Sequence, residues 1–234
     1  MSLEISKIMK KIFACLFFIL FVVSSFAQKD VTTFLGIPVD GTKSEMIRKL
    51  EAKGFEKVQL DYDIVLMGEF NGSDVMISIN TNGGKVYRVI VSDTKPRKEG
   101  QIKIRFNNLC DQFENNPKYF GEEMPIPEDE DISYEMKVNN KEYHAYFFQT
   151  TSEESDNIIS EKAFKEVASK VPADELSPSN ENLKKEYLDK VSELRTELIS
   201  KKLVWFTIVN TEYDKYYLAI YYVNTYNAPN GEDL

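Results

Sequence analysis

Few residues of this chain could act as a nucleophile and its base. The only histidine, His144, lies in EYHAYFF, which alternates like a strand, and Cys110 lies in a stretch with helical spacing. Nucleophilic catalysis needs a base beside the nucleophile, and the G-x-S-x-G motif is missing. One histidine and one cysteine outside the apolar N-terminal run also fall short of a zinc site. A cysteine–histidine pair stays open, because the sequence does not show whether the two residues meet.

Acidic residues are the other candidates for chemistry. The run Glu128-Asp129-Glu130-Asp131, within the loop 122–131, could bind calcium or flank a sugar. Its spacing differs from the D-x-[DN]-x-[DN]-G calcium loop, and a run of like charges is typical of a solvated loop. Calcium binding by this loop stays open, a hydrolase that uses acidic residues is the third functional interpretation, and no cofactor is predicted.

Aromatic residues form the pattern that rises above background. In the last hairpin, Val204–Val223, and in the strand expected at Glu142–Gln149, alternation places one set of side chains on each face. Both faces are apolar or aromatic, although a sheet with one wet face should alternate with polar residues. The candidates for partner binding, all expected on the second face, are Tyr146, Phe148, Trp205, Tyr217 and Tyr221.

The first 27 residues predict a signal peptide. Lysines precede an apolar run at 12–23, and Ser25 and Ala27 occupy the −3 and −1 positions of a signal-peptidase site. The run is shorter than the roughly 20 residues that a membrane-spanning helix needs. We therefore predict cleavage after Ala27 and an exported product, periplasmic or secreted, without membrane insertion after cleavage.

The mature chain is acidic and has the composition of a folded protein. Removal of residues 1–27, which hold three lysines and one glutamate, changes the net charge from −9 to −11. This charge disfavours nucleic acid and anionic membrane surfaces as partners. Cys110 remains without a second cysteine, so an intramolecular disulfide is impossible, and the helical spacing of its apolar neighbours favours a buried thiol.

Residues 28–94 predict a first α+β repeat. Thr42-Lys43-Ser44-Glu45 is a capping box, and the helix that it starts carries its apolar residues on one face. Turn signals at Asn71-Gly72 and Asn82-Gly83-Gly84 then indicate an antiparallel meander. The expected strands are 55–60, 64–70, 75–80 and 86–91.

Residues 95–234 predict a second repeat that is interrupted by a helical insertion at 150–202. A helix is expected at 101–116, and the expected strands are 132–138, 142–149 and the two of the last hairpin. The insertion holds two amphipathic stripes, and Ser177 with Pro178 is expected to start the second helix. One apolar stripe per helix cannot make a core of its own, so these helices are expected to pack on another surface.

Two interpretations of the second face compete. In the first, the helices of the insertion fold across it and bury Tyr146, Trp205, Tyr217 and Tyr221. In the second, the face is concave and binds a protein or glycan through tyrosine and tryptophan anchors. The first repeat has no insertion and has a more polar second face, which favours the first interpretation.

Two tandem helix-plus-four-strand units resemble the fold of β-lactamase inhibitor protein, in which helices back one face of an antiparallel sheet. LGIPVDGTKSEMIRKLEAKGF looks like the first helix of small outer-membrane assembly lipoproteins of related shape. FLGIPVDGTKSEMIRKLEAKGF and YNAPNGEDL resemble segments of a family of uncharacterised secreted proteins from Bacteroidetes, with the likeness covering Phe34–Gln149 and Leu203–Leu234. This likeness implies export and carries over no functional residues.

The sequence thus predicts an exported α+β protein of two tandem helix-plus-four-stranded antiparallel sheet repeats. The expected function is a non-catalytic binding or interaction module that acts through an aromatic sheet face on an unknown protein or glycan. The alternative is a glycan-binding surface or periplasmic module.

Overall fold

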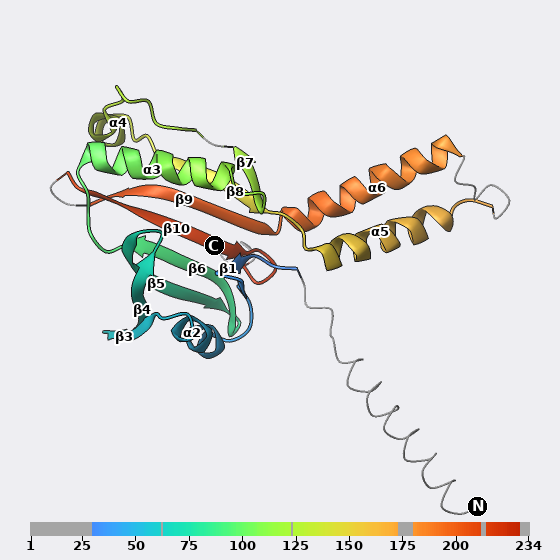
Figure 1. The fold of residues 1–234 in the computed structure, drawn as a ribbon, viewed down its shortest axis with the longest axis horizontal. Coiled ribbons are helices and arrows are strands. Elements are labelled where there is room, and N and C mark those ends of the chain that lie inside the picture. The colour runs from blue at the N-terminus through green and yellow to red at the C-terminus, as the bar shows by residue number, and fades with distance from the viewer. Residues whose placement is uncertain (1–29, 62, 123, 173–179, 212–213, 230–234) are drawn as a thin grey trace, which may run out of the picture. The chain divides into compact units, whose positions relative to one another are not determined.

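The computed structural model describes residues 30–61, 63–122, 124–172, 180–211 and 214–229. The predicted signal peptide and the Ser177 cap lie outside the described residues. Residues Val31–Leu234 form one compact unit. Its described part is α+β, with five helices, an eight-stranded antiparallel sheet and a small two-stranded sheet (Figure 1).

The elements follow the chain in two runs, in each of which one helix precedes four strands of the large sheet, and the described part of the second run contains three further helices. The first run consists of β1 (Thr33–Phe34), β2 (Ile37–Pro38), α2 (Lys43–Glu51), β3 (Glu56–Leu60), β4 (Asp63–Phe70), β5 (Ser73–Asn82) and β6 (Lys85–Asp93). The second consists of α3 (Glu99–Glu114), β7 (Tyr119–Glu122), α4 (Ile132–Val138), β8 (His144–Gln149), α5 (Glu153–Ala168), α6 (Glu181–Ile199), β9 (Lys202–Asn210) and β10 (Tyr216–Asn224).

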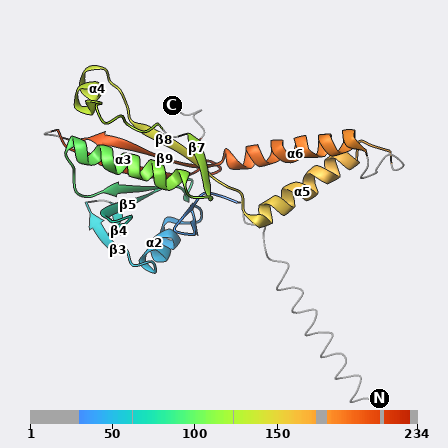
Figure 2. The ribbon, with the colours of Figure 1, turned by 45° about the horizontal axis from the view of Figure 1, so that its top comes forward.

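The large sheet has the strand order β3-β4-β5-β6-β10-β9-β8-β7. Strands β6 and β10 are neighbours in space although about 120 residues separate them, and they pair with Val91 opposite Ile220. Buried residues of α2 and α3 belong to one core with alternate residues of these strands, so both helices pack on the same face. Figure 2 shows α3 lying along this face. Along β5, β9 and β10, nearly every buried residue alternates with a half-buried one, as expected for a sheet covered on one face.

The local signals of the first run predict its structure well. The Thr42 side chain accepts a hydrogen bond from the Glu45 amide at 3.3 Å, and Glu45 Oε2 accepts one from the Thr42 amide at 2.9 Å, which confirms the capping box. The backbone hydrogen bond from Thr42 lowers the pKa of Glu45. Asn71 and Gly72 both have positive φ, 50° and 67°, as a tight hairpin between β4 and β5 requires.

The strand predicted at 132–138 is wrong, because this segment is the helix α4. The Asp131 side chain caps it by accepting a hydrogen bond from the Tyr134 amide at 2.8 Å. Glu99 of α3 accepts two further bonds, from the Ile132 amide at 2.9 Å and from Ser133 Oγ at 2.6 Å. These bonds satisfy donors of the first turn of α4, two of them backbone amides that have no partner within the helix. The fourth strand of the second run is β7, which lies between the helix predicted at 101–116 and the loop predicted at 122–131, where the sequence predicted no element.

The insertion also differs from its prediction. Helices α5 and α6 pack against each other, with Ile159, Ala163 and Leu194 buried in a cluster separate from the main core. They leave the sheet at the ends of β8 and β9 and run away from it (Figure 1). The expectation that they bury Tyr146, Trp205, Tyr217 and Tyr221 is therefore wrong. The two stripes face each other, which one stripe considered alone could not show.

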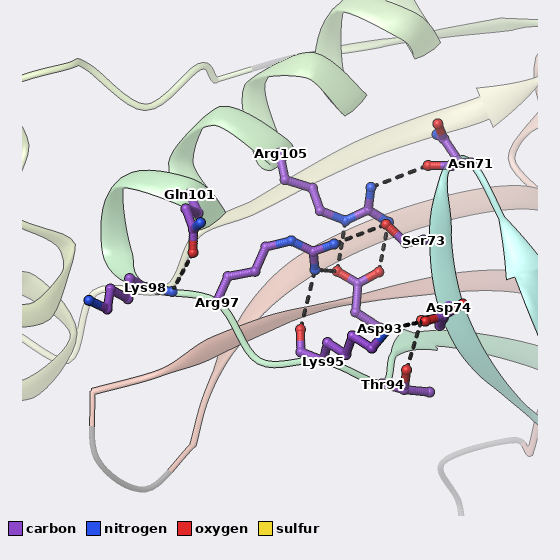
Figure 3. A network of polar contacts seen from close by, with 10 residues as sticks. All are labelled: Asn71, Ser73, Asp74, Asp93, Thr94, Lys95, Arg97, Lys98, Gln101 and Arg105. Atoms are coloured by element: carbon purple, nitrogen blue, oxygen red, sulfur yellow. Dashed lines mark hydrogen bonds and ion pairs between the residues drawn. The ribbon is translucent and has the colours of Figure 1, made fainter.

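A buried carboxylate joins the two runs at the end of β6. Asp93, whose side chain is 2% exposed, accepts two hydrogen bonds from Arg105 of α3, both at 2.7 Å (Figure 3). Arg97 adds a bond to Asp93 at 2.5 Å and one to Ser73 at 2.9 Å. Arg97 also exchanges backbone hydrogen bonds with Tyr216, which extends the pairing of β10 beyond β6. This network holds β5, β6, α3 and β10 together.

We predict that Asp93→Asn lowers the free energy of unfolding by about 3 kcal/mol, because it leaves two arginines short of their shared counter-charge. Urea unfolding followed by circular dichroism measures the loss. The control is Asp74→Asn, which breaks an exposed pair with Lys95 and should change the free energy by less than about 1 kcal/mol. Equal losses in the two variants would show that the buried network does not join the runs.

We also predict that the sheet folds without α5 and α6. Phe148 of β8 lies directly opposite Leu203 of β9, so a loop of about four residues can replace residues 152–200 and close a hairpin. The shortened protein should retain the near-ultraviolet circular dichroism of the sheet aromatics and unfold cooperatively. Loss of that signal would mean that the helices support the core.

Candidate functional site

The face of the large sheet opposite α2 and α3 is the candidate site, and we call it the open face. It consists of side chains that lie opposite one another on neighbouring strands and that point away from the core, because successive side chains of a strand point to opposite faces. Its members on β7 to β9 are Phe120, His144, Tyr146, Phe148, Leu203, Trp205, Thr207 and Val209, and those on β10, β6 and β5 are Tyr217, Ala219, Tyr221, Val223, Arg88, Ile90, Ser92, Met76, Ser78 and Asn80. All five residues predicted from the sequence belong to it.

Three of the predicted residues form one row across β8, β9 and β10. Trp205 lies opposite both Tyr146 and Tyr221 in the strand register. Its ring stacks on Tyr221 with the ring centroids 4.0 Å apart and the planes 4° from parallel. Tyr146 lies on the other side, 6.0 Å from Trp205 and tilted by 31°. Since the stack runs in the direction of the strand spacing, the rings stand upright on the sheet.

The other two predicted residues extend this surface in different directions. Phe148 stacks on Phe120 of β7, with the centroids 5.8 Å apart. Tyr217 is half-buried and lies opposite Val209, four residues from Tyr221 along β10. The structure thus brings four of the five into two neighbouring aromatic groups and leaves Tyr217 at a distance along the strand.

The β7 end of the open face is the most accessible. Tyr146 is 42% exposed and Phe120 is 44% exposed, whereas Phe148 and Trp205 are half-buried. Phe120 also lines a shallow cavity of about 310 Å³ with residues of α6, among them Leu188 and Ile199. Phe120 is missing from the sequence-based candidates because no strand was predicted at its position, although the adjacent aromatic pair Tyr119-Phe120 was a signal for a strand.

Arg88 is the second residue that the sequence-based candidates do not include, although alternation along its strand already predicts it on the second face. Its guanidinium carbon lies 5.7 Å from the Tyr221 ring centroid and 5.3 Å from that of Tyr87. A register shift opposite Asn80 and Thr81 makes Tyr87 an extra residue, so that Tyr87 and Arg88 reach the same face. Only the pairing register shows this bulge.

Beside its aromatic rows the open face carries the cation Arg88, whereas its acidic residues Glu69 and Asp74 lie opposite each other near the β4–β5 hairpin. Burial raises the pKa of the Tyr221 hydroxyl, and the positive charge of Arg88 opposes this rise. Tyr221 is therefore neutral at physiological pH. His144 lies 4.8 Å from the Tyr146 ring and is half-buried on the same face.

The cysteine–histidine pair does not form. Cys110 is fully buried in the core on the α3 side, which confirms the prediction of a buried thiol. His144 lies on the opposite face of the sheet. A nucleophile and a base separated by the sheet cannot act together.

Two acidic side chains in the described part of the loop, those of Glu130 and Asp131, already have hydrogen-bond partners within the chain. A hydrogen bond from Lys141 lowers the pKa of Glu130, and a bond from the Tyr143 hydroxyl at 2.6 Å adds to this effect. Asp131 caps α4. Within the described ranges, no three acidic, histidine or cysteine side chains form a group that could hold a metal ion.

Comparison with protein-family models, curated proteins and solved structures finds no match. The predicted likenesses to secreted proteins and to β-lactamase inhibitor protein therefore stay predictions. Among the described helices, none is long and apolar enough to cross a membrane.

We predict that Trp205 and Tyr221 stabilise each other by about 1 kcal/mol beyond the area that they bury. A double-mutant cycle of Trp205→Leu and Tyr221→Leu, measured by urea unfolding, gives this coupling energy. The control cycle pairs Trp205→Leu with Tyr217→Leu, whose position lies about 13 Å along the strand from Tyr221. Its coupling should be close to zero. Equal coupling in both cycles would contradict a specific stack.

Proposed function

We propose that the chain is an exported, non-catalytic interaction module that binds a partner protein through the open face. The single observation that carries this proposal is the exposure of the aromatic face, whose Tyr146 side chain is 42% exposed in the isolated chain. Large tyrosine and tryptophan side chains are the residues that most often anchor protein–protein interfaces.

The position of the inserted helices supports the proposal. They were the one element of the chain expected to cover the face, and they bury their apolar stripes against each other instead. A row of aromatic rings that is exposed at Tyr146 and half-buried at Trp205 and Tyr221 costs free energy in water, and apolar patches of this kind mark interaction sites.

Ring geometry favours a protein over a glycan. A pyranose stacks on a free aromatic face, but one face of Trp205 lies parallel to Tyr221 at 4.0 Å and the other is flanked by Tyr146. The stack therefore presents ring edges, with ridges and grooves into which apolar side chains of a protein can pack.

The fold is interpreted in the same proposal as a tandem duplication. One helix and four strands, α2 with β3–β6, would correspond to α3 with β7–β10, and the strand order of the sheet supports this correspondence. The insertion of α4 and of α5–α6 would then be later additions to the second unit. Export after cleavage at Ala27 belongs to the proposal as well.

The test is capture of partners by the mature chain from an envelope extract. The variant Phe120→Ser/Tyr146→Ser removes the two most exposed aromatic side chains of the open face, and we expect it to lose at least about 90% of the specifically captured protein. Mass spectrometry identifies and quantifies what is bound. Because both side chains are more than 40% exposed, the substitutions should leave the fold intact, which circular dichroism checks.

A matched control separates the face from general stickiness. Tyr134→Ser/Phe164→Ser removes two aromatic side chains that are 54% and 58% exposed on α4 and α5. Capture should be unchanged in this control. The proposal fails if both variants lose the same partners, or if neither does.

A further inference from the structure

Arg88 occupies a special place on the open face. The bulge in β6 places it beside Tyr87, and its strand pairing places it next to β10, so its guanidinium lies near the rings of Tyr87 and Tyr221. Arginine suits such a place because its planar, weakly hydrated head stacks on aromatic rings. The side chain continues the stack that Tyr146, Trp205 and Tyr221 begin.

The hydrogen-bond donors of Arg88 have no acceptor in the part of the chain that the structure describes. Its Nε atom is shielded from solvent and makes no hydrogen bond there, and neither does Oδ1 of Asn80, the residue directly opposite on β5. Nearly all buried polar groups in folded proteins are paired, because an unpaired donor loses its hydration without a substitute. By contrast, the half-buried Arg97, which follows β6, and Arg105 of α3 share the carboxylate of Asp93.

Among the residues that the structure describes, no carboxylate forms an ion pair with Arg88. This holds although the protein carries 38 acidic residues against 29 basic ones. Its cross-strand partners, Asn80 and Val223, are both uncharged. Arg88 is half-buried and its Nε is shielded, whereas its two terminal nitrogens are not among the shielded atoms, so a ligand can reach the guanidinium from the open face through these nitrogens.

We propose that Arg88 receives a carboxylate of the partner protein, from an Asp, a Glu or a C-terminus, while apolar side chains next to that carboxylate pack on Trp205 and Tyr221. This inference rests on the proposed function and adds the chemistry of the partner. Guanidinium and carboxylate form parallel, charge-assisted hydrogen bonds, which are stronger where neighbouring rings exclude water. The cation thus selects an acidic segment with apolar neighbours.

A pair of small probes tests the inference on the intact mature chain. N-acetyl-L-tyrosine carries a carboxylate beside an aromatic ring, and N-acetyl-L-tyrosinamide is its uncharged counterpart. Proton–nitrogen NMR follows the Nε–H of Arg88 and the indole N–H of Trp205. The assignment of the indole signal is unambiguous, because the chain has one tryptophan. We expect the acid to shift both signals and to bind at least about tenfold more tightly than the amide.

Variants assign this preference to Arg88. Arg88→Gln should reduce the preference for the acid to less than about twofold and leave the weak binding of the amide. Arg88→Lys keeps the charge without the planar fork and should give an intermediate preference, so it serves as the second variant if the glutamine variant is unstable. The control is Arg48→Gln on the exposed side of α2, which should leave the preference unchanged.

The contrary outcomes are distinct. Equal binding of acid and amide, or no shift of the Arg88 signal with the acid, overturns the inference about the carboxylate. Neither result decides the proposed function, which the capture experiment tests separately. Tighter binding of D-glucuronate than of N-acetyl-L-tyrosine would overturn the choice of a protein partner and indicate an acidic glycan.

Discussion

The pairing of β6 with β10 is the interaction on which the rest of the structure depends. It joins two four-stranded halves into one sheet, with Val91 opposite Ile220 on the core side and Ile90 opposite Tyr221 on the other. Because side chains alternate, one register fixes both the shared core under α2 and α3 and the continuous open face. The ion pairs of Asp93 and the backbone bonds between Arg97 and Tyr216 secure the same junction. Loss of this pairing would leave two apolar edges and divide the aromatic row from Arg88.

Where a signal is local, the sequence predicts the structure. The capping box at Thr42, the Asn71-Gly72 turn and the alternation of the last hairpin each depend on residues that are close in the chain, and each matches the structure. Alternation also placed all five candidate residues on one face. By contrast, the start of α4 donates hydrogen bonds to Glu99, more than 30 residues away, and its segment was therefore mistaken for a strand.

Long-range packing explains the other errors. Each helix of the insertion has one apolar stripe, and the sequence of that stripe is the same whether it packs on a sheet or on a second helix. The partner is the second helix, so the open face stays accessible where a covered face was expected. Alternation with Ile90 places Arg88 on the open face, but the approach of Tyr87 to it depends on a bulge that exists only once β5 and β6 are in register. Sequence reasoning could therefore find the aromatic surface but not its exposure or the contacts of Arg88.

The central claim is that the aromatic face is accessible in the isolated mature protein. Hydroxyl-radical footprinting with mass spectrometry measures this accessibility residue by residue, and the chain supplies its own references in exposed Tyr134 and buried Tyr216. Tyr146 and Phe120 should be oxidised at rates close to those expected for exposed side chains, as calibrated by Tyr134. Rates as low as that of Tyr216 would contradict it, because they would show that the face is covered.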